Sequence, residues 1–135
     1  RRGSRRWEPL SADLSGRHAV VTGASSGIGR ATALRLAELG ATLTLVMRDA
    51  AKAEETVNAL REESGNAAIR AELADLGLMA DVDALVARLA EAGEPIDILV
   101  NNAGALFNPR RETAEGLEAS FALLLLSPYR LTIYR

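Results

Sequence analysis

A glycine-rich loop is the part of this sequence whose residue types and spacing most clearly point to chemistry. Residues 22–29 read Thr-Gly-Ala-Ser-Ser-Gly-Ile-Gly. Glycines let a backbone turn tightly and approach a pyrophosphate, whose charge is met by free N–H groups and by the positive end of a following helix. Serine hydroxyls add further donors. We expect this loop to bind a dinucleotide cofactor through Gly23, Ser25, Ser26, Gly27, Ile28 and Gly29, the alternative being a strand-to-helix turn that merely needs glycine.

The choice of dinucleotide can be predicted from the residues about 20 positions past the glycines, where an acidic residue would bond the ribose 2′-hydroxyl of NAD. Met47 occupies this place and Arg48 follows it. No carboxylate is present there to repel a 2′-phosphate, and a guanidinium can pair with that group through two hydrogen bonds. The sequence therefore favours NADP over NAD. Asp49 could instead hold Arg48 in a local ion pair.

The elements that must position these residues form a regular alternation. Short aliphatic runs alternate with longer, alanine-rich segments of helical period, which is typical of β-α units and a parallel sheet. The expected strands are 18–22, 42–47, 67–73 and 96–100; the expected helices are 30–39, a segment from an Asp49 cap to about 64, 79–92 and 116–131. We therefore predict an α/β fold with a Rossmann-type, doubly wound parallel sheet that is incomplete, with about four strands and flanking helices.

Composition limits the chemistry that the chain can perform. It has 135 residues, 48% of them hydrophobic, which suits one ordinary domain. The absence of cysteine excludes disulfides, thiolate metal sites and cysteine nucleophiles. The single histidine, His18, leaves no material for a His-rich zinc cluster or a Ser-His-Asp triad, so no metal site is expected. His18 itself, at the start of a strand, is expected to be structural.

Charge and hydropathy indicate where the chain does not act. The formal net charge is −2, and four of the 16 basic residues are Arg1, Arg2, Arg5 and Arg6. The rest of the chain is therefore mildly acidic, unlike a nucleic-acid-binding domain, which usually has a basic face. No run approaches the 18 or so apolar residues of a membrane span, and nothing resembles a signal peptide. We expect residues 1–16 to be a disordered Arg-rich leader, residues 17–135 to be one NAD(P)-binding domain, and the location to be cytoplasmic.

Three motifs in register resemble the short-chain dehydrogenase/reductase family over residues 17–132. They are the glycine loop, Asn101-Asn102-Ala103-Gly104 after the fourth strand, and Asp75-Leu76 after the third. The resemblance implies that Asn102, Ala103 and Gly104 lie against the cofactor ribose, that Asn101 ties neighbouring strands, and that Asp75, with Leu76 beside it, faces the adenine. Asn-Asn can also bond its own backbone in a turn, and Asp75 can be a helix cap or a loop anion. Within the family, residues 46–49 and 111–121 are similar to retinol-dehydrogenase-like and member-12-like reductases.

The residues that perform hydride-transfer chemistry in this family are missing. Members use a tyrosine with a lysine four positions later, and a serine, to donate or accept the substrate proton. Here Tyr129 is followed by Ile133, and no lysine follows Lys52. Leu124 stands where the family has the asparagine of its proton relay, and leucine cannot form a hydrogen bond through its side chain. No catalytic residue is assigned.

Taken together, the motifs predict the cofactor-binding part of an NAD(P)-dependent oxidoreductase, ending before the catalytic residues of a protein that acts on an alcohol or carbonyl group. A small-molecule substrate and a homo-oligomer are expected only for a full-length form. An alternative is a non-catalytic dinucleotide-binding module with a regulatory or interaction role. A methyltransferase, which also has a glycine loop after its first strand, is disfavoured by Asn101-Asn102-Ala103-Gly104 and by Met47.

Overall fold

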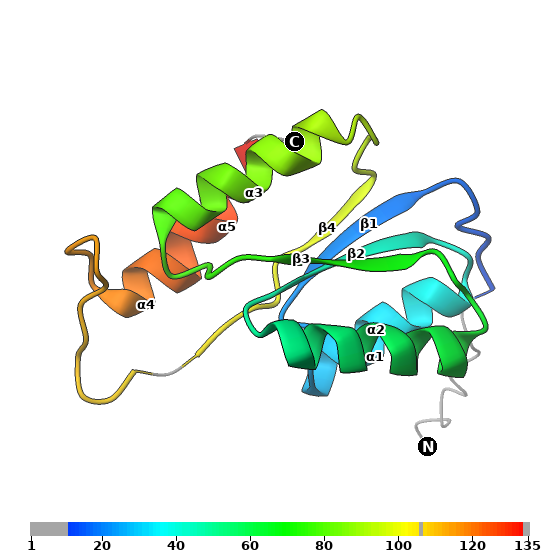
Figure 1. Cartoon of the computed structure of the whole chain (residues 1–135), viewed down its shortest axis with the longest axis horizontal. Coiled ribbons are helices and arrows are strands. Elements are labelled where there is room, and N and C mark those ends of the chain that lie inside the picture. Colours follow the sequence, from blue (N-terminus) through cyan, green and yellow to red (C-terminus); the bar gives the residue numbers. More distant parts are fainter. Residues whose placement is uncertain (1–10, 106, 134–135) are drawn as a thin grey trace, which may run out of the picture.

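A computed structural model describes residues 11–105 and 107–133 and contains one parallel sheet in that part of the chain (Figure 1). Its strands are β1 (His18–Thr22), β2 (Thr42–Met47), β3 (Ile69–Leu73) and β4 (Ile98–Val100); its longer helices are α1 (Gly27–Glu38), α2 (Ala50–Ser64) and α3 (Met79–Glu91). A last helical segment consists of α4 (Ala119–Phe121), a π-helical stretch η1 (Ala122–Leu126) and α5 (Ser127–Ile133).

The strand order is β3-β2-β1-β4, and every pairing is parallel. β2 and then β3 are added on one side of β1, and β4 pairs with the other side of β1. Val20, for example, lies opposite Thr44 of β2 and Leu99 of β4. Strand order therefore reverses beside β1, which is where open α/β sheets bind ligands. The predicted Rossmann-like fold with four parallel strands is confirmed.

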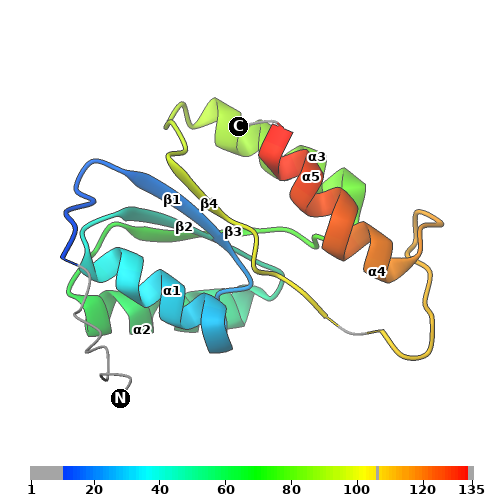
Figure 2. The ribbon, with the colours of Figure 1, turned by 180° about the vertical axis from the view of Figure 1, so that it is seen from behind.

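Helices cover both faces of the sheet. Figures 1 and 2 show α1 and α2 on one face, and α3 with α5 on the other. β1 is buried along its whole length: Ala19 and Val21 belong to the core under α1 and α2, whereas Val20 belongs to the core under α3. A strand that is buried on both faces has a nearly continuous apolar sequence. The apolar run at 18–22 therefore predicted β1 correctly.

Several predicted boundaries need correction. α1 begins at Gly27 and not at residue 30, because the later glycines of the loop form its first turn. β3 begins at residue 69 and not at 67, since Asn66 accepts a hydrogen bond from Ala68 N and holds that stretch as a loop. β4 begins at 98 and not at 96. The last helix begins at 119 and not at 116, because Gly116 has a φ of +77° in a turn.

The end signals of two helices are confirmed. Asp49 caps α2, where its carboxylate accepts a hydrogen bond of 3.1 Å from Lys52 N. Gly65 ends that helix with a φ of +71°, and Gly93 follows α3 with a φ of +67°. Such left-handed positions after a helix favour glycine. The sequence did not predict the π-helical stretch, in which Ser127 N donates to Ala122 O in place of the usual α-helical partner.

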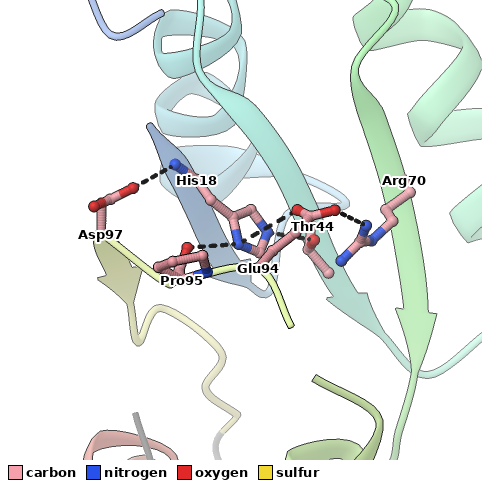
Figure 3. Close-up of polar contacts among 6 residues, drawn as sticks. All are labelled: His18, Thr44, Arg70, Glu94, Pro95 and Asp97. Carbon is pink, nitrogen blue, oxygen red and sulfur yellow. Dashed lines mark hydrogen bonds and ion pairs between the residues drawn. The ribbon is translucent and has the colours of Figure 1, made fainter. Parts of the chain in front are cut away.

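His18 is structural, as the sequence predicted. Its ring is buried at the amino end of β1, with Nε2 2.7 Å from Thr44 Oγ1 and Nδ1 3.3 Å from Pro95 O (Figure 3). Glu94, whose carboxylate lies 3.8 Å from Nδ1, also pairs with Arg70 of β3 at 3.0 Å. These contacts tie three strands to the segment before β4. They lie at the end of the sheet opposite to the glycine loop.

Replacing Asp97, in the same group, should change how stability depends on pH. The carboxylate of Asp97 accepts a hydrogen bond of 2.9 Å from His18 N, and this bond, followed by the charge of Arg17, lowers its pKa below the ordinary value of 3.8. A lowered pKa stabilises the fold above the pKa of the unfolded chain, and that contribution is lost as pH falls through the folded value. Asp97→Asn should therefore lower the free energy of unfolding more at neutral pH than at an acidic pH below 3.8. Urea denaturation measures this, and an equal loss at both pH values would contradict it.

No helix in the described ranges is long and apolar enough to cross a membrane.

Candidate functional site

A cleft of about 560 Å³ lies at the carboxyl ends of the strands. Its volume falls within the range of roughly 300–1,000 Å³ that is usual for small-molecule sites. Residues that follow all four strands line it: 23–25 after β1, 46–49 and Lys52 at β2 and α2, 74–77 after β3, and 103–105, Phe107 and Arg111 after β4, with Leu123 from η1. The cleft therefore lies where the reversal of strand order predicts a ligand site.

The structure brings most of the predicted site residues together at this cleft. Those that line it are Gly23, Ser25, Arg48, Asp75, Leu76, Ala103 and Gly104. Ser26, Gly27 and Ile28 stand exposed at the start of α1, where the Ile28 side chain is 80% accessible. Gly29 is buried and Asn102 is half-buried, and both lie in contact with Gly23 of the loop. A direct contact between any of these residues and a cofactor stays a prediction.

Two of the glycines are required by close backbone packing. A Cβ at Gly29 would lie 2.2 Å from Gly23 O and 2.3 Å from Asn102 Nδ2, which no side chain can tolerate. Gly23 has a φ of +68°, and a Cβ there would lie 2.8 Å from the Cα of Ala103. The glycine loop is thus pressed against both the first turn of α1 and the loop after β4. Only glycine permits this approach.

Hydrogen bonds from Thr22 and Asn102 join the loops after β1 and β4. Thr22 Oγ1 accepts from Asn102 N at 3.0 Å and from Ala103 N at 2.9 Å. Asn102 Nδ2 donates to Gly23 O at 3.1 Å. The prediction that Asn101 ties neighbouring strands is wrong, because its side chain donates to Thr132 Oγ1 of α5 at 3.3 Å and Asn102 makes the link. The role of Thr22 in joining these loops was not predicted, although a hydroxyl residue directly before the first glycine could have indicated it.

The amino end of α1 is suited to an anion. Ser26 occupies the N-cap position but makes no side-chain hydrogen bond to the first turn. Amides at the start of a helix lack partners within it and carry the positive end of the helix dipole. α2 differs, because Asp49 caps it. The uncapped turn of α1 follows directly on the glycine loop that lines the cleft, so its amide N–H groups can donate hydrogen bonds to a phosphate there.

Positive charge lies on the wall of the cleft formed by β2 and α2. Arg48 and Lys52 are exposed there, and neither forms an ion pair with any residue in the described part of the chain. The Asp49 carboxylate bonds to Lys52 N, so the alternative of an Arg48–Asp49 ion pair is not formed. Both cations are therefore available to a phosphate group.

Asp75 is a loop anion that lines the cleft. Its carboxylate accepts from Gly77 N at 2.9 Å, and its own N donates to Asp81 Oδ2 at 2.8 Å. The alternative that it caps the next helix is wrong, because Leu78 occupies the N-cap position of α3. The contact with adenine stays a prediction.

Sequence reasoning missed Lys52, Phe107, Arg111 and Leu123 as lining residues. The Arg111 guanidinium lies 5.6 Å from the centre of the Phe107 ring, which brings a cation and an aromatic face together on one wall. Lys52 lies four residues beyond Arg48, in the first turn of α2, and it is the only lysine of the chain. That position beside Arg48 was a signal that could have identified it.

The arrangement can bind a phosphate-bearing dinucleotide, since the glycine loop that leads into the uncapped first turn of α1 lines the same cleft as two cations without ion-pair partners, Arg48 and Lys52. Tyr129, the tyrosine that the structure describes, is 60% accessible on α5 and is not among the residues lining the cleft. No three His, Asp or Glu side chains in the described ranges are placed to hold a metal ion. The groups that line the cleft are suited to binding such a dinucleotide.

Comparisons with known proteins agree with this site. A family model for short chain dehydrogenase matches residues 17–132. The chain is 39% identical over 125 residues to Dehydrogenase/reductase SDR family member 12 of Bos taurus, and 36% identical over 124 residues to Retinol dehydrogenase 13 of Homo sapiens. These matches cover 93% and 92% of this chain but 39% and 38% of the relatives. A solved short-chain dehydrogenase from Sphingobium yanoikuyae in complex with NADPH aligns with a TM-score of 0.74 at 40% identity, covering 87% of this chain and 46% of that one.

Proposed function

Because this chain belongs to the short-chain dehydrogenase family, we propose that it binds NADP(H) as the cofactor-binding part of an oxidoreductase that acts on an alcohol or carbonyl group. The observation that carries the proposal is that the glycine loop, which leads into the uncapped amino end of α1, lines the same cleft as the unpaired Arg48. A similar solved structure is described as a complex with NADPH, which supports this choice of cofactor.

Each part of the site has a distinct role in this proposal. The glycine loop and the first turn of α1 bind the pyrophosphate, with Ser25 and Ser26 as additional donors. Arg48 pairs with the 2′-phosphate and so selects NADP over NAD. Asp75 and Leu76 lie against the adenine, while Asn102, Ala103 and Gly104 hold the ribose. NADPH, when bound, supplies a hydride to a carbonyl carbon.

The domain assignment belongs to the same proposal. In this proposal residues 17–135 belong to the NAD(P)-binding domain and residues 1–16 to the Arg-rich leader, of which residues 1–10 lie outside the described part of the chain. The expected disorder does not hold at Leu14, because its N donates to Leu39 O at 2.8 Å and its side chain packs against the core under α1 and α2. A cytoplasmic location, a small-molecule substrate and a homo-oligomer for the full-length form stay predictions.

Displacement of bound NADPH tests the proposal. Nicotinamide fluorescence should change saturably as NADPH is titrated into the purified chain. Adenosine 2′,5′-bisphosphate should displace it much better than 5′-AMP does, because only the former offers a 2′-phosphate to Arg48. The matched control is S-adenosylmethionine, which has an adenosine but no phosphate and should not compete. Absence of saturable NADPH binding, or equal displacement by S-adenosylmethionine, would contradict the proposal.

A second candidate is a dinucleotide-binding module that performs no hydride transfer. Leu124 favours it, because this residue replaces the relay asparagine of the family and lies near the cleft: a Cβ at Gly104, which lines the cleft, would be 3.4 Å from its Cδ2. Binding of NADPH alone fits both candidates. Joining the chain to the catalytic half of a related reductase separates them, since only the first candidate predicts NADPH-dependent carbonyl reduction by the hybrid protein.

A further inference from the structure

The amino end of α3 is capped by a residue that lies far along the chain. Leu78 occupies the N-cap position and has no side chain able to accept a hydrogen bond. In its place, the carboxylate of Glu115 accepts from Met79 N at 2.5 Å and from Ala80 N at 3.0 Å. A carboxylate bonded to two first-turn amides is a strong cap, because the hydrogen bonds are charge-assisted and the positive end of the helix dipole attracts it.

Glu115 is held in place by a compact turn. Thr113 Oγ1 accepts from Glu115 N and from Leu117 N, and Thr113 N donates to Leu117 O at 2.7 Å. The left-handed φ of Gly116, +77°, closes the turn. At the base of the turn, Ala119 N donates to Arg111 O at 2.8 Å. Arg111 and Glu115 therefore belong to one hydrogen-bonded unit, residues 111–119.

This unit joins two walls of the cleft. Gly77 lies two residues before α3 and lines the cleft on one side. Arg111 and Phe107, which stack on each other, line it on the side of the segment after β4. In the described ranges, the two bonds of Glu115 are the only hydrogen bonds that connect residues 107–118 to the strands and helices preceding them. Without Glu115, packing alone would hold that wall.

We propose that Glu115 is a positioning residue for cofactor binding. Its two hydrogen bonds to the amino end of α3, here called the clasp, fix the wall formed by Phe107 and Arg111 relative to Gly77. The inference rests on the proposed function. A wall that is already ordered costs less conformational entropy when a ligand binds, so loss of the clasp weakens binding even though Glu115 is not among the cleft-lining residues.

The test compares three variants of the full chain. Glu115→Ala should raise the Kd of NADPH about tenfold, since several side chains must then be ordered on binding. Glu115→Gln, whose amide oxygen can still accept one of the two bonds, should restore part of the affinity. The matched control is Asp83→Ala, because Asp83 also joins α3 to a later segment, through Arg130 at 2.6 Å, but neither residue lines the cleft. This control should leave the Kd within about twofold.

Amide hydrogen exchange supplies a readout that general destabilisation would not reproduce. Glu115→Ala should speed exchange at Met79 and Ala80 and across residues 107–118, while exchange in β1 and β2 stays unchanged. Unaltered NADPH affinity in Glu115→Ala, or an equal loss of affinity in Asp83→Ala, would overturn the inference. If the wild-type chain did not bind NADPH, the proposed function would fail, and the exchange at residues 107–118 would still report whether the clasp exists.

Discussion

Gly29→Ala should weaken NADPH binding by at least about 100-fold, the loss expected when about two charge-assisted hydrogen bonds to phosphate are broken. The added methyl group would lie 2.2 Å from Gly23 O and 2.3 Å from Asn102 Nδ2, so either α1 or the glycine loop must move. Either movement would displace the backbone of the glycine loop, which lines the cleft. Isothermal titration of NADPH into the variant measures the effect, with circular dichroism to establish that the sheet and helices are retained.

Gly93→Ala is the matched control for this prediction. Gly93 has a φ of +67°, and a Cβ there would meet nothing within 4 Å. The same glycine-to-alanine change should thus cost about 1–2 kcal/mol of stability through backbone strain, and it should leave NADPH affinity unaltered because Gly93 lies after α3 and does not line the cleft. Equal affinities of Gly29→Ala and Gly93→Ala would show that the close packing of the loop has no part in binding.

Arg48→Gln should remove the preference for NADPH over NADH. Arg48 lies on the cleft wall, and within the described residues no carboxylate pairs with it. Hydrogen bonds to charged groups contribute about 1.5–3 kcal/mol, so the Kd of NADPH should rise roughly 10- to 150-fold. The Kd of NADH should change little, because NADH has no 2′-phosphate. Titrations with both cofactors measure the ratio.

Arg17→Gln controls for the loss of one positive charge. Arg17 lies at the opposite end of the sheet, where it pairs with Asp97 at 3.4 Å, and it does not line the cleft. This variant should keep the preference of the wild-type chain for NADPH. If Arg48→Gln also kept that preference, the 2′-phosphate would have to be bound elsewhere, and Lys52 on the same wall would be the next residue to replace.

The sequence predicted the parts of the fold that depend on local patterns. The apolar run at 18–22, the Asp49 cap and the glycines at 65 and 93 each act over a few residues, and the structure confirms them. The glycine loop could be identified because glycines at this spacing allow the backbones of the loop, α1 and the segment after β4 to pack closely. Boundaries were less accurate where a side chain from another element decides them, as at Asn66, which also donates to Ala37 O and Ala41 O.

Long-range contacts could not be predicted in the same way. Glu115 reaches α3 across 35 residues, and Asn102 reaches Gly23 across 79. Neither spacing follows from a helical or strand period, since both depend on the strand order that places β4 beside β1. Arg111 and Phe107 were missed as lining residues for this reason. Arg48 could be predicted because it directly follows β2, and β2 and β1 are parallel neighbours whose carboxyl ends lie at the same edge of the sheet as the glycine loop.

The most direct test of the central claim, that the cleft at the carboxyl ends of the strands binds NADP(H), is amide hydrogen exchange across the chain with and without NADPH. The account predicts slower exchange in residues 23–29, 46–52, 74–77 and 102–105, which meet at the cleft or form the loop beside it. The amino ends of the strands around His18 and Glu94 should be unaffected. Protection confined to those amino ends or to the exposed face of α5, with none in the glycine loop, would contradict it.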